Sequence, residues 1–247
     1  MCEAQNKQLQ SNQPVLRFQK LLKFCYFILA LLLYSCGDGK AKQTTETQAS
    51  ENQTEQAETP ETKSKTILCF GDSITAGYGL DDTNDAYPGI LQDTIDALNI
   101  DYTVINSGVS GETSAGGKSR IDWVIKQTPT VFLLELGAND GLRGVPITET
   151  RANLQAIIDV VKAKSPDTKI VLAGMQLPPN MGTEYTTDFK QLFIDLAADN
   201  NISFIPFILE AVGGNPELNQ RDGIHPNIEG HKLVANTVWE VLGPLVM

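Results

Sequence analysis

Short apolar runs alternate with amphipathic stretches along most of the chain. Three runs are long and apolar enough to predict buried parallel strands, at Thr66–Phe70, Val131–Leu136 and Ile170–Met175. Two weaker runs, at Tyr102–Asn106 and Ile202–Ile205, predict two more strands. The segments between these runs have the apolar spacing of helices. Strands joined by helices favour right-handed crossovers, and therefore a mostly parallel sheet of five strands.

The stretches between the strands carry apolar residues three and four positions apart, which is the spacing of one helix face. Pro88 fits the first turn of such a helix, and a last helix is expected from about Ile228 to Leu242. Alternating strands and helices predict the α/β class, as a three-layer α/β/α sandwich with its active site at the carboxyl ends of the strands. The helical stripes are Tyr87, Ile90, Leu91, Ile95 and Leu98; Leu154, Ile157, Ile158 and Val161; and Phe189, Leu192, Phe193, Leu196 and Ala197.

The N-terminal part has the pattern of an export signal. Basic residues precede the apolar segment Phe24–Leu33, which is too short to span a bilayer comfortably. The sequence Leu-Tyr-Ser-Cys-Gly follows at 33–37 and resembles a bacterial lipobox. Residues 1–35 are therefore expected to be a lipoprotein-type signal peptide, with Cys36 as the lipidated first residue. The alternative is a plain signal anchor with an incidental cysteine.

Residues 36–63 are dominated by Thr, Gln, Glu, Ala and Lys and have no apolar periodicity. Such a segment buries too little surface to fold, and it is interpreted as a disordered tether. Residues 64–247 are expected to form one domain. We therefore expect an exported bacterial lipoprotein, periplasmic or on the cell surface, held to the membrane by its anchor. Residues 1–15 are interpreted as an extension upstream of the true start.

The net charge of −11 lies in residues 64–247, because the first 63 residues carry seven charges of each sign. An acidic domain argues against nucleic acid as a partner, since phosphate binding needs a basic surface. Cys69 is the one cysteine of this domain, so no disulfide forms within it, and no Cys/His cluster suggests a metal. Cys69 lies in an apolar run and is interpreted as a buried core residue.

Candidate chemistry begins at 71–75, Gly-Asp-Ser-Ile-Thr, where the first strand ends and Ser73 would face a cleft. A serine hydroxyl needs a general base, usually histidine, and the histidine needs a carboxylate on its other nitrogen. Asp222 stands three residues before His225, across a turn that contains glycine. The other histidine, His231, falls in the predicted last helix and is expected to be structural or exposed.

Acyl transfer also needs an oxyanion hole, a set of fixed N–H donors aimed at the developing negative oxygen. Two loops that follow strands, 106–114 and 136–140, are candidates. Glycines permit close approach of the backbone, and Asn139 offers a side-chain amide. By spacing alone, each loop is an ordinary glycine turn.

In chain order, Gly-Asp-Ser, a glycine loop, Gly-x-Asn-Asp and Asp-x-x-His resemble the SGNH (GDSL-type) hydrolase superfamily. The resemblance implies a flavodoxin-like sandwich with Ser73 as nucleophile, His225 as base and Asp222 as its orienter. It also implies three oxyanion donors: the N–H of Ser73, the N–H of Gly111 and the amide of Asn139. The Gly-x-Ser-x-Gly elbow of α/β-hydrolases is absent.

The resemblance covers about residues 65–245. The residues that flank the motifs are similar to those of the bacterial thioesterase, arylesterase and lysophospholipase group. It implies a small-molecule ester or thioester substrate, no metal and no organic cofactor, and the protein is expected to be a monomer. Two alternatives stay open: a carbohydrate O-deacetylase of the same superfamily, and a non-catalytic surface lipoprotein. The stretches that carry the detailed match are 71–79, 110–114, 135–144 and 222–227.

The segment 142–146 directly follows the Asn139 motif, and we expect it to be a mobile lip over the acyl pocket. Gly141 and Gly144 bracket the lip and permit hinge-like changes of the backbone. Leu142 and Val145 offer apolar surface to an acyl chain. The alternative is a static loop with two turn glycines.

Overall fold

The computed structural model describes residues 65–126 and 128–247. Five strands form one sheet in the order β2-β1-β3-β4-β5, and every neighbouring pair is parallel. The predicted five-stranded parallel sheet is therefore confirmed. The strands are β1 (Lys65–Gly71), β2 (Tyr102–Gly108), β3 (Val131–Glu135), β4 (Lys169–Ala173) and β5 (Ser203–Ile205).

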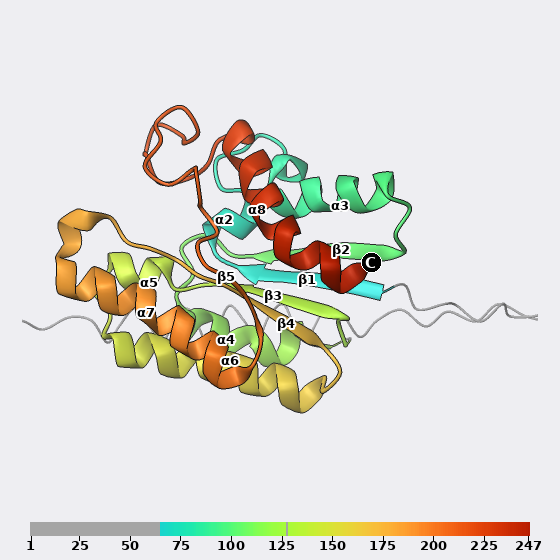
Figure 1. Ribbon diagram of the computed structural model, residues 1–247, viewed down its shortest axis with the longest axis horizontal. Coiled ribbons are helices and arrows are strands. Elements are labelled where there is room, and N and C mark those ends of the chain that lie inside the picture. The colour runs from blue at the N-terminus through green and yellow to red at the C-terminus, as the bar shows by residue number, and fades with distance from the viewer. Residues whose placement is uncertain (1–64, 127) are drawn as a thin grey trace, which may run out of the picture. The chain divides into compact units, whose positions relative to one another are not determined.

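Helices cover both faces of the sheet, as Figure 1 shows. One face carries α3 (Tyr87–Ala97) and α8 (Ile228–Val246), and the other carries α4 (Ser114–Val124), α6 (Ile147–Lys164) and α7 (Thr183–Asn200). This is the expected three-layer α/β/α sandwich. The short helices are α2 (Ser73–Ala76), η1 (Thr83–Asp85), α5 (Ala138–Leu142) and η2 (Pro179–Met181).

Burial explains why the central strands were the easiest to predict. All five residues of β3 are buried, because helices cover both faces of a central parallel strand. Only one of the seven residues of the edge strand β2 is buried, and its sequence is correspondingly more polar. Cys69 on β1 is a free, fully buried thiol, as predicted, and burial raises its pKa to about 12.

Several strand boundaries differ from the predicted ones by one residue, and three boundaries differ by two or more residues. The strand β2 continues to Gly108, because Gly108 pairs with Gly71 although this part of the strand is polar. The strand β4 ends at Ala173 instead of Met175, where the chain turns beside Pro206 so closely that a Cβ on Gly174 would lie 2.5 Å from the Pro206 carbonyl oxygen. The helix α8 continues past Leu242 to Val246.

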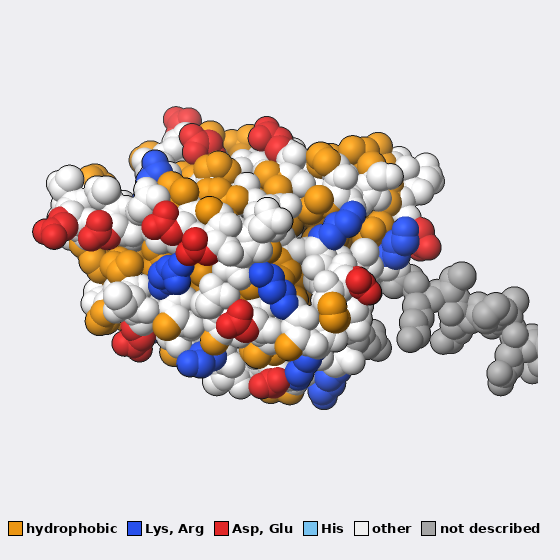
Figure 2. Space-filling model, turned by 60° about the horizontal axis from the view of Figure 1, so that its bottom comes forward, with side chains coloured by type: hydrophobic (Ala, Val, Ile, Leu, Met, Phe, Trp, Pro, Cys, Tyr) orange, Lys and Arg blue, Asp and Glu red, His pale blue; other side chains and the backbone are white. Residues whose placement is uncertain are grey.

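One face of the described domain carries charged side chains of both signs (Figure 2). On the face that Figure 2 shows, Lys and Arg side chains are scattered among Asp, Glu and apolar side chains. No helix within 65–126 and 128–247 is both long and apolar enough to cross a membrane. The predicted signal peptide, the tether and Cys36 lie outside the described residues.

The parallel arrangement brings the carboxyl ends of all five strands to one edge of the sheet. The turn that carries Ser73, the predicted nucleophile, follows β1 there, the Gly111 loop follows β2, and α5 with Asn139 follows β3. The long segment 206–227 leaves β5 and returns to α8, and it carries Asp222 and His225. The predicted site residues are therefore brought to one place by four different segments, each of which follows a strand.

Candidate active site

The nucleophile turn is a sharp strand-to-helix junction. Asp72 caps α2, and its Oδ1 accepts a hydrogen bond from the Ile74 N–H at 3.1 Å. A side chain at position 71 is excluded, because a Cβ there would lie 2.0 Å from Thr75 Oγ1 and 2.5 Å from Glu135 Oε2. The junction presents the Ser73 hydroxyl to a cavity.

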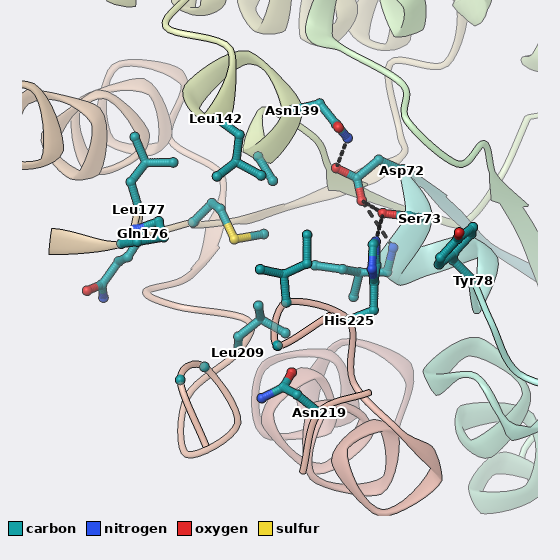
Figure 3. Close-up of a pocket in the computed structure, with 18 of the residues that line it drawn as sticks. Asp72, Ser73, Tyr78, Asn139, Leu142, Gln176, Leu177, Leu209, Asn219 and His225 are labelled. Carbon is teal, nitrogen blue, oxygen red and sulfur yellow. Dashed lines mark hydrogen bonds between the residues drawn. The ribbon is translucent and has the colours of Figure 1, made fainter. Parts of the chain in front are cut away.

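Ser73, His225 and Asp222 form a continuous line of hydrogen bonds. Ser73 Oγ lies 2.9 Å from His225 Nε2, and His225 Nδ1 lies 2.7 Å from Asp222 Oδ2. Figure 3 shows the Ser73 and His225 side chains facing each other across the mouth of the cavity. Asp222 Oδ1 accepts the N–H groups of Ile224 and His225, each at 3.0 Å, which closes the local turn expected from the Asp-x-x-His spacing.

The Asp222 carboxylate is held in its charged form. Partial burial acts to raise its pKa, but hydrogen bonds from the His225 ring and from two backbone N–H groups outweigh burial and lower the pKa to about 2. The anion therefore stays opposite His225 Nδ1 at any pH above about 3. This arrangement favours the tautomer that leaves Nε2 free to accept the Ser73 proton.

Two residues to which the sequence interpretation gave no role hold His225 in place. The Tyr78 ring packs on the imidazole with the two centroids 4.6 Å apart. The Gln220 N–H donates to the His225 carbonyl at 2.7 Å, while its side-chain amide donates to the Tyr78 carbonyl at 2.6 Å. Tyr78 lies within the first motif, but nothing in that motif indicates the stacking.

His231 is structural, one of the two roles expected for it. It is buried in α8, and its Nδ1 accepts the Tyr87 N–H at 3.3 Å. Burial lowers its pKa to about 4, and repulsion from His225 acts in the same direction. His231 is therefore neutral at physiological pH, and the histidine that hydrogen-bonds to Ser73 is His225.

Both predicted oxyanion loops reach the cavity. Gly111 lines it with a φ of 77°, a left-handed conformation that favours glycine. Asn139 lies in the first turn of α5, and its Nδ2 donates to Asp72 Oδ2 at 3.1 Å. Figure 3 shows this amide nitrogen turned toward Asp72 beside Ser73. One N–H of the amide is thus engaged, and the second stays available to a substrate oxygen.

Beneath Ser73 lies a buried polar network that the sequence interpretation missed. Glu135 Oε2 accepts the Asp72 N–H at 3.2 Å and the Thr75 hydroxyl at 2.8 Å, and Thr75 Oγ1 lies 2.8 Å from the Tyr87 hydroxyl. Complete burial, reinforced by the Asp72 charge, raises the pKa of Glu135 well above its usual value, which favours the neutral form of this side chain. The sequence feature that points to this network is Glu135 itself, an acidic residue at the end of the otherwise apolar strand β3.

Asp72 itself is buried and carries a perturbed pKa. Burial raises the pKa to about 6, although hydrogen bonds from Ile74, Asn139 and Ser73 and the charge of His225 act to lower it. The carboxylate is therefore ionised at neutral pH at some cost to the folded state.

The predicted lip is only partly at the cavity. Leu142 is 42% exposed and lines the cavity, whereas Val145 is not among the lining residues. The backbone of Val145 is tied elsewhere, because its N–H donates to the Asp140 carbonyl at 3.0 Å and its own carbonyl accepts the Tyr185 hydroxyl at 2.8 Å.

The cavity next to Ser73 has a volume of about 720 Å³. Apolar side chains from five different segments make up much of its wall, which suits an aliphatic or aromatic group better than a sugar. Within the described parts of the chain, no cluster of three or more His, Cys, Asp or Glu residues could hold a metal ion. The apolar lining includes Ile74, Leu142, Met175, Leu177, Phe207, Leu209 and Ile224.

Comparison with known proteins agrees with this geometry. The sequence profile of the GDSL-like lipase/acylhydrolase family matches residues 69–233, more than half of the chain. The chain belongs to this family. It is therefore a hydrolase of ester bonds, and the predicted resemblance to the SGNH (GDSL-type) hydrolases is confirmed.

Individual relatives are similar over the whole described domain. The esterase TesA of Pseudomonas aeruginosa is 38% identical over 189 residues, which cover 76% of this chain and 92% of that protein. The thioesterase 1/protease 1/lysophospholipase L1 of Escherichia coli is 36% identical over 182 residues, covering 73% and 85%. A crystal structure of TesA superposes with a TM-score of 0.70 and 38% identity, over 73% of this chain and 99% of that one.

Proposed function

We propose that Ser73, His225 and Asp222 form the catalytic triad of a serine esterase that transfers an acyl group from an ester or thioester to water. The observation that carries the proposal is the line of hydrogen bonds from Ser73 Oγ through the imidazole to Asp222, at 2.9 and 2.7 Å. This line opens on a cavity that also receives Gly111 and Asn139.

The chemistry follows from this arrangement in two halves. His225 Nε2 takes the Ser73 proton while Oγ attacks the carbonyl carbon, and the N–H groups of Ser73 and Gly111 with the Asn139 amide bind the oxyanion. The tetrahedral intermediate collapses to an acyl-enzyme, and His225 gives its proton to the departing alcohol or thiol. Water, deprotonated by His225, then attacks the acyl-enzyme and releases the acid and the free Ser73 hydroxyl.

The apolar cavity favours an acyl or aryl group as the part of the substrate that is bound. Relatives named arylesterase and thioesterase/lysophospholipase support the same class of substrate. We propose p-nitrophenyl esters and acyl-CoA thioesters as substrates, with no metal or organic cofactor. A panel of these compounds, assayed beside acetylated sugars, tests the proposal. Turnover of acetylated sugars alone would support the O-deacetylase alternative, and no turnover of any ester would support a binding role.

We propose that the protein is an exported lipoprotein, with residues 1–35 as signal peptide, Cys36 lipidated and residues 36–63 as a tether to the catalytic domain. The support is the lipobox-like sequence at 33–37 and the absence of apolar periodicity after it. Cys36→Ala is expected to release the protein from membranes with its specific activity unchanged. A variant that stays in the membrane fraction after signal cleavage would refute lipidation. We also propose a monomer, which light scattering of the domain tests.

A further inference from the structure

Arg120 is a buried cation that lies behind the proposed oxyanion loop. It comes from α4, its side chain is 10% exposed, and its guanidinium carbon lies 3.8 Å from the centroid of the Phe70 ring. A buried charge costs free energy unless it is paired and hydrogen-bonded. The contacts of Arg120 must therefore offset the cost of burying its charge.

The guanidinium of Arg120 binds three separate segments at once. Its Nε donates to both carboxylate oxygens of Glu112, at 2.7 and 2.9 Å. Its Nη1 donates to Ser107 Oγ at 3.0 Å, and its Nη2 donates to the Ser107 carbonyl at 2.9 Å. Nη2 also lies 3.4 Å from the Gly71 carbonyl. The planar fork thereby joins the end of β1, the end of β2 and the loop that follows β2.

These three segments carry the reacting groups of the proposed site. Gly71 stands two residues before Ser73, and Glu112 directly follows Gly111. The loop between Ser107 and Glu112 is otherwise tied to β1 by the Val109 N–H, which donates to the Gly71 carbonyl at 3.0 Å. The distance between Ser73 Oγ and the Gly111 N–H therefore depends on where Arg120 holds the two chain segments.

A second connection binds the other donor to the same loop. Asp140, the residue after Asn139, is buried, and its Oδ2 accepts the Ser114 N–H at 2.7 Å. This bond ties α5 to the beginning of α4, the helix that carries Arg120. The segments that carry the Gly111 N–H and the Asn139 amide are thus both connected to α4. Arg120, on the same helix, also reaches the Gly71 carbonyl at the end of β1.

We propose that Arg120 is a positioning residue of the hydrolytic reaction, one that sets the separation of Ser73 and the Gly111 N–H through its bonds to Gly71, Ser107 and Glu112. This inference rests on the proposed function. Lysine cannot replace the fork, because a single ammonium on a flexible stem cannot hold three segments in one plane. Small errors in the placement of a donor cost transition-state binding more than substrate binding.

The test is Arg120→Lys, measured with a p-nitrophenyl ester and with an alkylboronic acid, which forms a tetrahedral adduct on an active serine. We expect kcat to fall by about 10- to 100-fold while KM changes by less than about twofold. Boronate affinity is expected to fall by the same factor as kcat/KM. The matched control is Arg151→Lys, which alters an exposed pair with Asp199 on the far helices and should leave both quantities unchanged.

A merely structural role predicts a different result. In that case the melting temperature and the fraction of active enzyme fall, while kcat per titrated site and boronate affinity match the Arg151→Lys control, and the inference is wrong. If Arg120→Lys does not fold, Glu112→Gln is the deciding variant. It weakens the contact with Arg120 but keeps the side-chain shape and one acceptor oxygen of residue 112. Unchanged kcat and boronate affinity in Glu112→Gln overturn the inference, and a selective loss of both supports it.

Failure of this inference and failure of the proposed function are separable. If Ser73→Ala retains esterase activity, the proposed function itself is wrong. If Ser73→Ala is inactive and Arg120→Lys behaves like Arg151→Lys, only the role of Arg120 is wrong.

Discussion

Replacing Asp72 by asparagine is expected to remove a loss of stability that wild type suffers as the pH rises from 4 to neutrality, and to impair turnover. The pKa of Asp72 rises from 3.8 to about 6 on folding, chiefly because the carboxyl group is buried. The folded state therefore binds this proton more tightly than the unfolded state, and wild-type stability falls as pH rises from about 4 to about 6. A shift of about two pKa units corresponds to about 3 kcal/mol, and Asp72→Asn lacks this titration.

Thermal unfolding of wild type and Asp72→Asn from pH 4 to pH 8 measures the effect. The melting temperature of the variant minus that of wild type should increase by roughly 6–12 °C between pH 4 and pH 8, for a domain of this size. Asp188→Asn, which removes an exposed carboxylate, should show no such increase. A difference that stays constant over this range would refute the reasoning about the burial of Asp72.

The same substitution should lower kcat by about 10²-fold, within the range for loss of one oxyanion donor. The Ile74 N–H and Asn139 Nδ2 bind different oxygens of the Asp72 carboxylate, and asparagine has an NH2 donor in place of one of these oxygens, so it cannot accept both bonds in this geometry. The Asn139 amide then loses the partner that orients it. A variant that is more stable at pH 8 and fully active would show that Asp72 does not orient Asn139.

Two further predictions concern the cavity and its donors. Asn139→Ala should lower kcat by about 10²–10³-fold with little change in KM, because its amide binds the transition state more strongly than the substrate; steady-state kinetics of a variant with wild-type melting temperature checks this, and an unchanged kcat would exclude the donor role. Leu142→Ser should lower kcat/KM for octanoyl esters by about 10-fold or more relative to acetyl esters, since a lost leucine contact weakens binding of the chain; an equal loss for both esters would show that Leu142 does not contact the acyl chain.

The fold and the Asp222–His225 contact could be predicted because each rests on a local pattern, whereas the role proposed for Ser73 rests on the order of several motifs along the chain. Buried parallel strands are continuous apolar runs, and Asp222 and His225 bind each other across a turn of three residues. The edge strand β2 was predicted too short, because its last residues are polar and are ordered by pairing with β1. Local patterning carries no information about such pairing.

Interactions between distant segments account for what the sequence did not reveal. The raised pKa of Glu135 depends on burial and on Asp72, 63 positions away. The Asp72 contact of Asn139 joins residues 67 positions apart. Val145 was expected in the cavity wall, but a hydrogen bond from Tyr185, on a different helix, holds its backbone. Each of these contacts requires the packed sheet before it can be recognised.

The most direct test of the central claim is covalent labelling of the nucleophile. An alkyl fluorophosphonate should phosphonylate wild-type protein once, with loss of esterase activity in proportion to labelling, because His225 and the oxyanion donors activate Ser73 alone. Mass spectrometry of the digested protein should place the adduct on Ser73, and Ser73→Ala should be folded, unlabelled and inactive. An adduct on another residue, or esterase activity retained by Ser73→Ala, would contradict the account.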